Sequence, residues 1–271
     1  MKISKKLISA IVMLTLSFVM LVTSSFAWFS MNTNVKATGM TVSAKADQLF
    51  LQIAKANNGA GLNDTEALVE VILNSEKEEM APVTAAKSAT PDDPDTPDTN
   101  ERELAPLTAT DNVLAANSVK WFISTSDSPD SATAKVDYVD VTSAIDDDTQ
   151  AYWLINSFDI RLNPAAGLTT AANPLTCSVA LSQSSTDEIA KAVSVLVVCG
   201  ENAMLFSQGA SGWTTIGKQL TAGAFSNPAA GYVKVDVYVF FDGENANCKT
   251  NNVTTSSYGV DVYFSVANAV A

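Results

Sequence analysis

The sequence predicts an all-β protein that folds as an antiparallel β-sandwich, preceded by an N-terminal signal helix. Segments in which apolar and polar residues alternate recur along the chain, whereas helical periodicity is sparse. Hydrophobic residues make up 47% of the 271 residues and charged residues only 17%, so the chain can bury a substantial core.

The clearest strand runs from Tyr232 to Asp242. It has one apolar face, formed by Val233, Val235, Val237, Val239 and Phe241, and its other face carries Tyr232, Lys234, Asp236, Tyr238 and Asp242. A second strand, Gly259–Ala267, alternates in the same way, with Val260, Val262, Phe264 and Val266 facing inward and Asp261 and Ser265 facing outward. Both patterns are typical of half-buried antiparallel strands.

Seven further segments have strand character, which gives about nine strands at the spacing of a sandwich. They are Gly39–Ala46, Gln48–Ala54, Val119–Ser124, Lys135–Val141, Tyr152–Leu162, Leu175–Leu181 and Val193–Cys199. Asp64–Leu73 fits either a helix or a strand, and Thr186–Ala192 fits one helical turn. We therefore expect a single sandwich domain over residues 39–271.

The N-terminus has the order of features that a secretory signal requires. Lys2, Lys5 and Lys6 precede an apolar run over residues 7–22, and the small residues Ser25 and Ala27 then mark a cleavage site. Residues 1–27 are thus a predicted signal peptide, and the mature protein would begin at Trp28 in the extracellular space. The alternative is an uncleaved anchor over residues 7–35, which is long enough to span a bilayer.

The chain is acidic, with a formal charge of −13 that becomes −16 once the three lysines of the signal peptide are removed. A basic face for nucleic acid is therefore not expected, and contact with a membrane is expected only through the signal peptide. The segment from about residue 88 to residue 103 is rich in Pro and Asp and contains no large apolar residue. It is predicted to be a disordered, solvated loop.

The chain contains no histidine, and this absence restricts its chemistry more than any other feature. A histidine general base, a Ser–His–Asp triad and an imidazole zinc site are all excluded. We therefore expect no enzymatic activity, no catalytic residues and no cofactor. A hydrolase that uses a carboxylate pair or a Ser–Lys pair is the remaining catalytic alternative.

Three acidic features are candidates for a metal or catalytic site. Asp242 and Glu244 could supply oxygen ligands to Ca²⁺, but they lack the spacing of an EF-hand loop, so an acidic turn is the preferred interpretation. Asp146–Asp148 is interpreted as a solvated turn. Asp159 and Arg161 lie on one face of a strand, which indicates a surface ion pair rather than a general acid–base set.

The tryptophans and cysteines each allow two interpretations. Scattered tryptophans could form a sugar-stacking surface, although packing in the core or at an edge is preferred; they are Trp28, Trp121, Trp153 and Trp213. A hairpin centred on Glu188 would place Cys177 opposite Cys199, within reach of a disulfide, and export makes oxidation possible. The alternative is two buried free thiols, with Cys248 left over in a polar loop.

The junction from Ser24 to Ala46 resembles that of the camelysin and TasA-type secreted matrix proteins of Gram-positive bacteria. The shared pattern is a small-residue cleavage site, an aromatic pair, a polar extended stretch and a Gly-led strand. It is matched here by Ala27, Trp28-Phe29, Asn32–Lys36 and Gly39–Ala44. Beyond this junction, the chain agrees with the family only in being acidic and β-rich with one long acidic insertion.

The resemblance implies a jelly-roll sandwich, export through a dedicated signal peptidase, and fibres in a biofilm matrix. In such fibres the mature N-terminal segment of one copy completes the sheet of a neighbour. Camelysin is also classed as a metallopeptidase, but that activity does not carry over to a chain without histidine or an HExxH motif.

We therefore expect a secreted structural protein of the cell surface or biofilm matrix, which assembles with other copies or with homologous matrix proteins. The alternative is an extracellular binding module, such as one for glycans. The expected assembly element is the extended segment of residues 28–38 with the glycine that follows it; its key residues are Trp28, Phe29, Met31, Val35 and Gly39. Its apolar residues lie at the tip and do not alternate, so it gains little from its own sheet. A loose chain end is the other interpretation.

Overall fold

The computed structural model describes residues 40–46, 51–62, 70–75, 80–89, 103–126, 136–143, 152–164, 170–181, 188–209, 212–248 and 259–266. In this part of the chain the fold is all-β, and helical structure is confined to short 3-10 turns such as η1 (Ala116–Ser118) and η4 (Glu188–Ala192). The predicted signal peptide and the segment of residues 28–38 lie outside the described residues.

The largest sheet has seven strands, and every pairing in it is antiparallel. Its order is β14-β13-β12-β15-β10-β2, with β7 beside β13. The bounds are β2 (Leu51–Lys55), β7 (Leu114–Ala115), β10 (Trp153–Leu162), β12 (Val193–Cys199), β13 (Asn202–Gly209), β14 (Gly212–Ile216) and β15 (Val233–Phe241).

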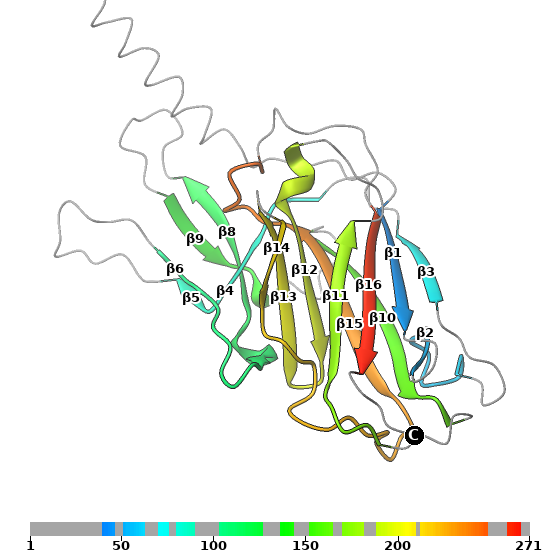
Figure 1. The fold of residues 1–271 in the computed structure, drawn as a ribbon. Coiled ribbons are helices and arrows are strands. Elements are labelled where there is room, and N and C mark those ends of the chain that lie inside the picture. Colours follow the sequence, from blue (N-terminus) through cyan, green and yellow to red (C-terminus); the bar gives the residue numbers. More distant parts are fainter. Residues whose placement is uncertain are drawn as a thin grey trace, which may run out of the picture.

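A four-stranded sheet packs against one face of the large sheet (Figure 1). Its order is β11-β16-β1-β3, with bounds β1 (Met40–Ala46), β3 (Glu70–Ser75), β11 (Leu175–Leu181) and β16 (Gly259–Val266). β1 runs parallel to β16, while the other pairs are antiparallel. β1 therefore lies inside its sheet, between β16 and β3, and not at an edge.

The core between these two sheets follows the predicted alternation. Val235, Val237, Val239 and Phe241 of β15 are fully buried in it, and so are the four inward residues predicted for β16. Burial of each such side chain contributes about 1.5–3 kcal/mol. The alternating segments therefore place their apolar faces as the sequence predicts.

The large sheet is covered on its second face as well. There β4 (Thr84–Ala86), β8 (Lys120–Ser126) and β9 (Val136–Asp140) form a small sheet of order β4-β8-β9. Trp121 of β8 packs on Trp153 and Phe240 of the large sheet, with ring centroids 4.7 and 4.9 Å apart. A second apolar cluster thus joins the small sheet to the large one.

All nine predicted strands are confirmed, and those at residues 175–181 and 193–199 have the predicted bounds. The ambiguous segment 64–73 ends in a strand, β3, and the predicted helical turn is η4. β13 and β14 were not predicted. The pair β5 (Ser88–Ala89) and β6 (Leu104–Ala105) joins the two ends of the predicted acidic loop, so Ser88 and Ala89 belong to a strand.

The predicted hairpin between residues 175–181 and 193–199 is wrong. β11 pairs with β16 in the four-stranded sheet, whereas β12 pairs with β13 and β15 in the large sheet. The 3-10 turn η4 buries Ile189 and Ala190 in the core between them, and the chain crosses there from one sheet to the other. Cys177 and Cys199 are therefore not neighbours on adjacent strands, and both are free thiols in this structure.

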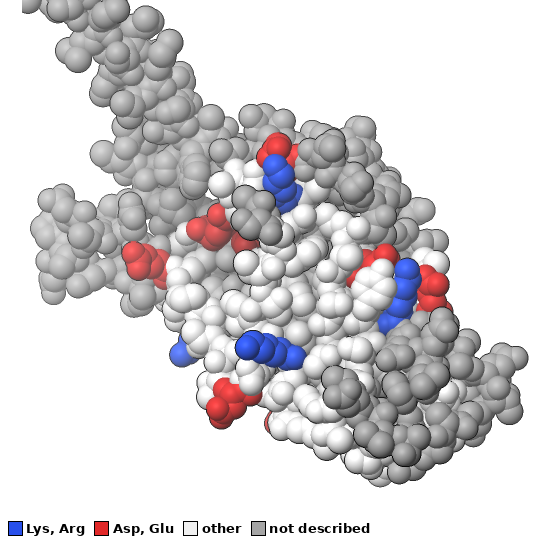
Figure 2. Space-filling view, in the orientation of Figure 1, with Lys and Arg blue, Asp and Glu red and all other residues white. Residues whose placement is uncertain are grey.

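Charged groups on the outer face of the four-stranded sheet are paired with one another. Lys45 of β1 lies 3.7 Å from Asp261 and 3.5 Å from Glu70, and it also sits over the ring of Tyr263. The hydroxyl of Ser43 donates to Asp261. Figure 2 shows the charged groups on this side of the molecule in a few small clusters, with uncharged residues between the clusters.

Candidate functional site

The residues predicted for export and assembly all lie outside the described part of the chain. They are Ser25, Ala27, Trp28, Phe29, Met31, Val35 and Gly39. Asp146–Asp148 also lies outside it. The remaining candidate site is a sheet edge that the described strands leave open to an incoming chain.

One such place is the side of the sandwich formed by β2 and β3, which we call the open side. Among the described residues β2 pairs only with β10 and β3 only with β1, and the two strands contact each other. Val71 of β3 is half-buried against the core, while Ile72 beside it is 60% exposed. Two unpaired backbone edges and an exposed apolar side chain thus lie together.

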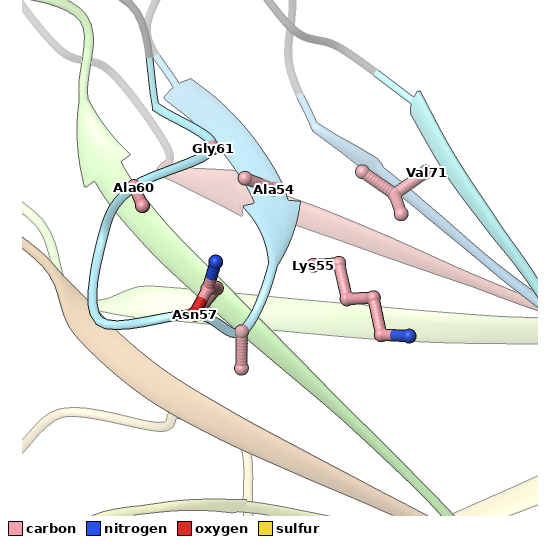
Figure 3. Close-up of a pocket in the computed structure, with 7 residues that line it drawn as sticks. Ala54, Lys55, Asn57, Ala60, Gly61 and Val71 are labelled. Carbon is pink, nitrogen blue, oxygen red and sulfur yellow. The ribbon is translucent and has the colours of Figure 1, made fainter.

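A pocket of about 580 Å³ lies at this side. Its lining is mostly small, and consists of Ala54, Lys55, Ala56, Asn57, Ala60, Gly61 and Val71. Figure 3 shows Lys55 and Val71 on one side of the pocket and Asn57 and Ala60 on the other. The short side chains leave room for a large apolar group, and Lys55 is the only charged residue among the described residues of the lining.

One wall of the pocket is a tight turn held by a buried carboxylate. Asn58 and Gly59 have φ of 51° and 76°, and the N–H of Ala60 donates to the carbonyl of Asn57. These are the features of the Asn-Gly turns that close hairpins. A methyl group on Gly59 would come within 2.8 Å of the Tyr232 ring, so the position has no space for a side chain.

Asp159 of β10 is the carboxylate that holds this turn. It is 1% exposed, and its Oδ2 accepts hydrogen bonds from the backbone N–H groups of Asn57 (2.9 Å) and Gly59 (2.7 Å). The prediction of a surface pair is wrong for Asp159, because this side chain is buried. The guanidinium of Arg161 donates instead to the side chain of Gln52 at 2.8 Å.

The acidic turn after β15 is tied to the small sheet. Asp242 accepts hydrogen bonds from the hydroxyl of Thr84 (2.9 Å) and the N–H of Glu244 (3.1 Å), and Tyr138 donates to Glu244 (2.9 Å). Burial raises the pKa of Asp242. No group of three or more His, Cys, Asp or Glu side chains suited to a metal occurs among the described residues, and a calcium site here stays a prediction.

The tryptophans predicted to pack in the core do so where they are described. Trp121 and Trp153 are 3% and 5% exposed and stack on each other, and Trp213 is half-buried against the main core. The buried rings of Trp121 and Trp153 offer no open face to a sugar. Trp28 lies outside the described residues.

The three thiols are buried in the core between the sheets. The Sγ of Cys177 contacts the Sδ of Met204 across the gap between the sheets, at 3.8 Å. Burial raises the pKa of Cys177, raises that of Cys199 to about 11 and raises that of Cys248 to about 12. Cys248 is thus in the core and not in a polar loop.

Comparisons with protein-family models, with curated proteins and with solved structures each found no match. Within the described residues there is also no helix long and apolar enough to cross a membrane. The open side and its pocket were not predicted as a site. The Asn-Gly dipeptide directly after a strand is the one sequence signal that indicates its turn.

Proposed function

We propose that this chain is a secreted structural protein of the bacterial cell surface or biofilm matrix that forms fibres by strand exchange. The single observation that carries the proposal is the open side, where two unpaired edges adjoin a pocket with a small, apolar lining. The resemblance of the N-terminal junction to camelysin and TasA-type proteins supports it, and implies a jelly-roll topology and a dedicated signal peptidase.

The donor in this proposal is the segment of residues 28–38 of a second copy. That segment directly precedes β1, which lies inside its own sheet, so a continuation in extended form leaves the sheet at its end. An extended chain beside an open edge gains main-chain hydrogen bonds along its length. Head-to-tail exchange does not close on itself unless the rotation between copies allows it, so it produces fibres.

The pocket suits the aromatic tip of the donor. Trp28 and Phe29 are the large apolar residues there, and Ala54, Ala60 and Gly61 leave space that a ring fills. Burial of a Phe-sized side chain contributes about 1.5–3 kcal/mol. The main chain would thus supply the pairing, and the tip would fix its register.

Electron microscopy of the mature protein tests the proposal directly. The chain that begins at Trp28 should form filaments above a threshold concentration, and deletion of residues 28–38 should leave a folded protein that forms no filaments. The pocket is tested by Ala60→Phe, which fills it from an exposed position, with Ala222→Phe as the matched control on an exposed loop elsewhere. Filaments of the deletion variant at the wild-type threshold would refute strand donation.

The alternative function, an extracellular glycan-binding module, requires exposed aromatic rings. Trp121 and Trp153 are buried against each other, so they do not favour it. Intact mass of the secreted form tests export separately. A product that begins at Trp28 supports the signal peptide, and one that retains Lys2, Lys5 and Lys6 indicates an anchor.

A further inference from the structure

The side of the sandwich opposite to the open side is formed by β11 and β14, and we call it the uncharged side. None of the residues in β11 (LTCSVAL) or β14 (GWTTI) is charged, and none is a proline. Among the described residues β11 pairs only with β16, and β14 only with β13. Two further backbone edges are therefore unpaired in this part of the structure.

Edge strands of natural proteins usually carry a charge, a proline or a bulge that prevents pairing with another chain. The open side has Lys55 on β2 and Glu70 on β3, and the small sheet has Asp140 on its edge strand β9. The uncharged side has no such group. Figure 2 shows an area of uncharged residues around β11 in the middle of the face in view.

At the start of β11 the edge is covered by another segment of the same chain, which contains Leu220 and Thr221. The N–H of Leu220 donates to the carbonyl of Leu175, and the N–H of Leu175 donates to the hydroxyl of Thr221. Beyond these contacts, Leu181 and Trp213 are half-buried against the core, and Thr214 of β14 is exposed. The accessible part of this side is therefore β14 together with the second half of β11.

Net charge indicates which partner suits this edge. The chain carries −13, so two copies repel each other across most of their surfaces. They approach with least repulsion where neither copy has a charged side chain. A second copy of the same chain therefore fits this uncharged edge better than it fits the edges that carry Lys55, Glu70 and Asp140.

We propose that β14 of one copy pairs with β14 of a second copy, antiparallel across a two-fold axis. Such a contact uses the same surface on both copies and closes as a dimer. The seven-stranded sheet then continues from one molecule into the next, and the half-buried Trp213 of each copy becomes covered. This association is side by side, so it goes beyond the head-to-tail exchange proposed above and rests on a different pair of edges.

Thr214→Lys tests the pairing, because it places a charge on the exposed face of β14. Thr108→Lys is the matched control, since Thr108 is exposed on a loop and receives the same charge. The mature chain and both variants are compared by sedimentation equilibrium below the concentration at which filaments form, after thermal melts show that each one folds. Like charges brought together across the axis should weaken dimerisation by about tenfold or more in Thr214→Lys, and Thr108→Lys should behave as the wild type.

Hydrogen exchange gives a second measurement that does not depend on a variant. Backbone amides of residues 212–216 should become more protected as the wild-type concentration rises. The pairing is overturned if Thr214→Lys and Thr108→Lys associate equally, or if protection of β14 does not change with concentration. Filaments that persist in Thr214→Lys as single rather than paired strands would leave the proposed head-to-tail assembly intact, so the two proposals fail separately.

Discussion

Replacing Asp159 with alanine removes the acceptor for two backbone N–H groups of the turn that walls the pocket. Hydrogen bonds to a charged group contribute about 1.5–3 kcal/mol each, which gives about 3–6 kcal/mol for the pair. Part of this is recovered, because the exposed backbone at Asn57 regains water and the desolvation cost of the carboxylate disappears. We therefore expect a loss of about 2–4 kcal/mol in the free energy of unfolding.

Thermal unfolding of the mature chain measures this loss. For a domain of this size, 1 kcal/mol shifts Tm by about 2–4 °C, so Tm should fall by roughly 4–16 °C. Glu188→Ala is the control, because Glu188 is exposed and pairs at the surface with Lys191 at 2.7 Å. Its removal should change stability by less than about 1 kcal/mol. Equal shifts for the two variants would refute the anchoring role of Asp159.

A chemical readout separates anchoring of the turn from global stability. Deamidation of Asn58 requires the Gly59 nitrogen to lose its proton and attack the Asn58 side chain. Asp159 holds that N–H at 2.7 Å and fixes the turn. Asp159→Ala should therefore speed the gain of about 1 Da in the peptide that contains Asn58, measured by mass spectrometry of the folded protein. An unchanged rate would mean that the carboxylate does not restrain the turn.

Three further predictions concern other parts of the fold. Trp121→Ala should cost about 3–5 kcal/mol, and hydrogen exchange should show loss of protection in β4, β8 and β9 before β12. Burial raises the pKa of Asp242 above its unfolded value, so stability is lost as pH rises through the folded pKa; Asp242→Asn should raise Tm relative to wild type more at pH 7 than at pH 4. Cys177, Cys199 and Cys248 should resist alkylation at pH 8 until the protein is denatured, and rapid labelling of the native protein or a Cys177–Cys199 linkage in unreduced peptide maps would contradict this.

Strands with one apolar face could be predicted from their alternation, whereas of the two neighbouring strands covered on both faces β12 was predicted and β13 was not. β15 and β16 alternate because one side of each meets the main core. β13 contains the continuous apolar run Ala203–Phe206, in which Met204 and Phe206 face the main core while Ala203 and Leu205 face the second cluster. Cover on both faces removes the period of two on which the prediction depends.

Sheet order was also beyond the reach of the sequence pattern. The symmetry of Cys177 and Cys199 about Glu188 indicated a hairpin because strands that follow each other in the chain are often paired. Here η4 inserts its apolar residues into the core between the two strands and carries the chain across the sandwich. The pocket was missed for a related reason, since the side on which β2 meets β3 depends on which strands end each sheet.

The covering of the large sheet limits where this molecule can associate by strand pairing. One face is buried under the four-stranded sheet and the other under β4, β8 and β9, so among the described residues large apolar side chains are exposed only singly, as at Ile72 and Ile155. Within the described structure, unpaired backbone groups remain at the lateral edges of the sheets. The two sides differ, because one has a pocket lined by Lys55 among other residues, whereas the strands of the other carry no charge. A side with a pocket can select the side chains of an incoming segment. An edge without charged side chains does not repel the same edge of a second copy. For this reason we assign strand donation to the first side and self-pairing to the second.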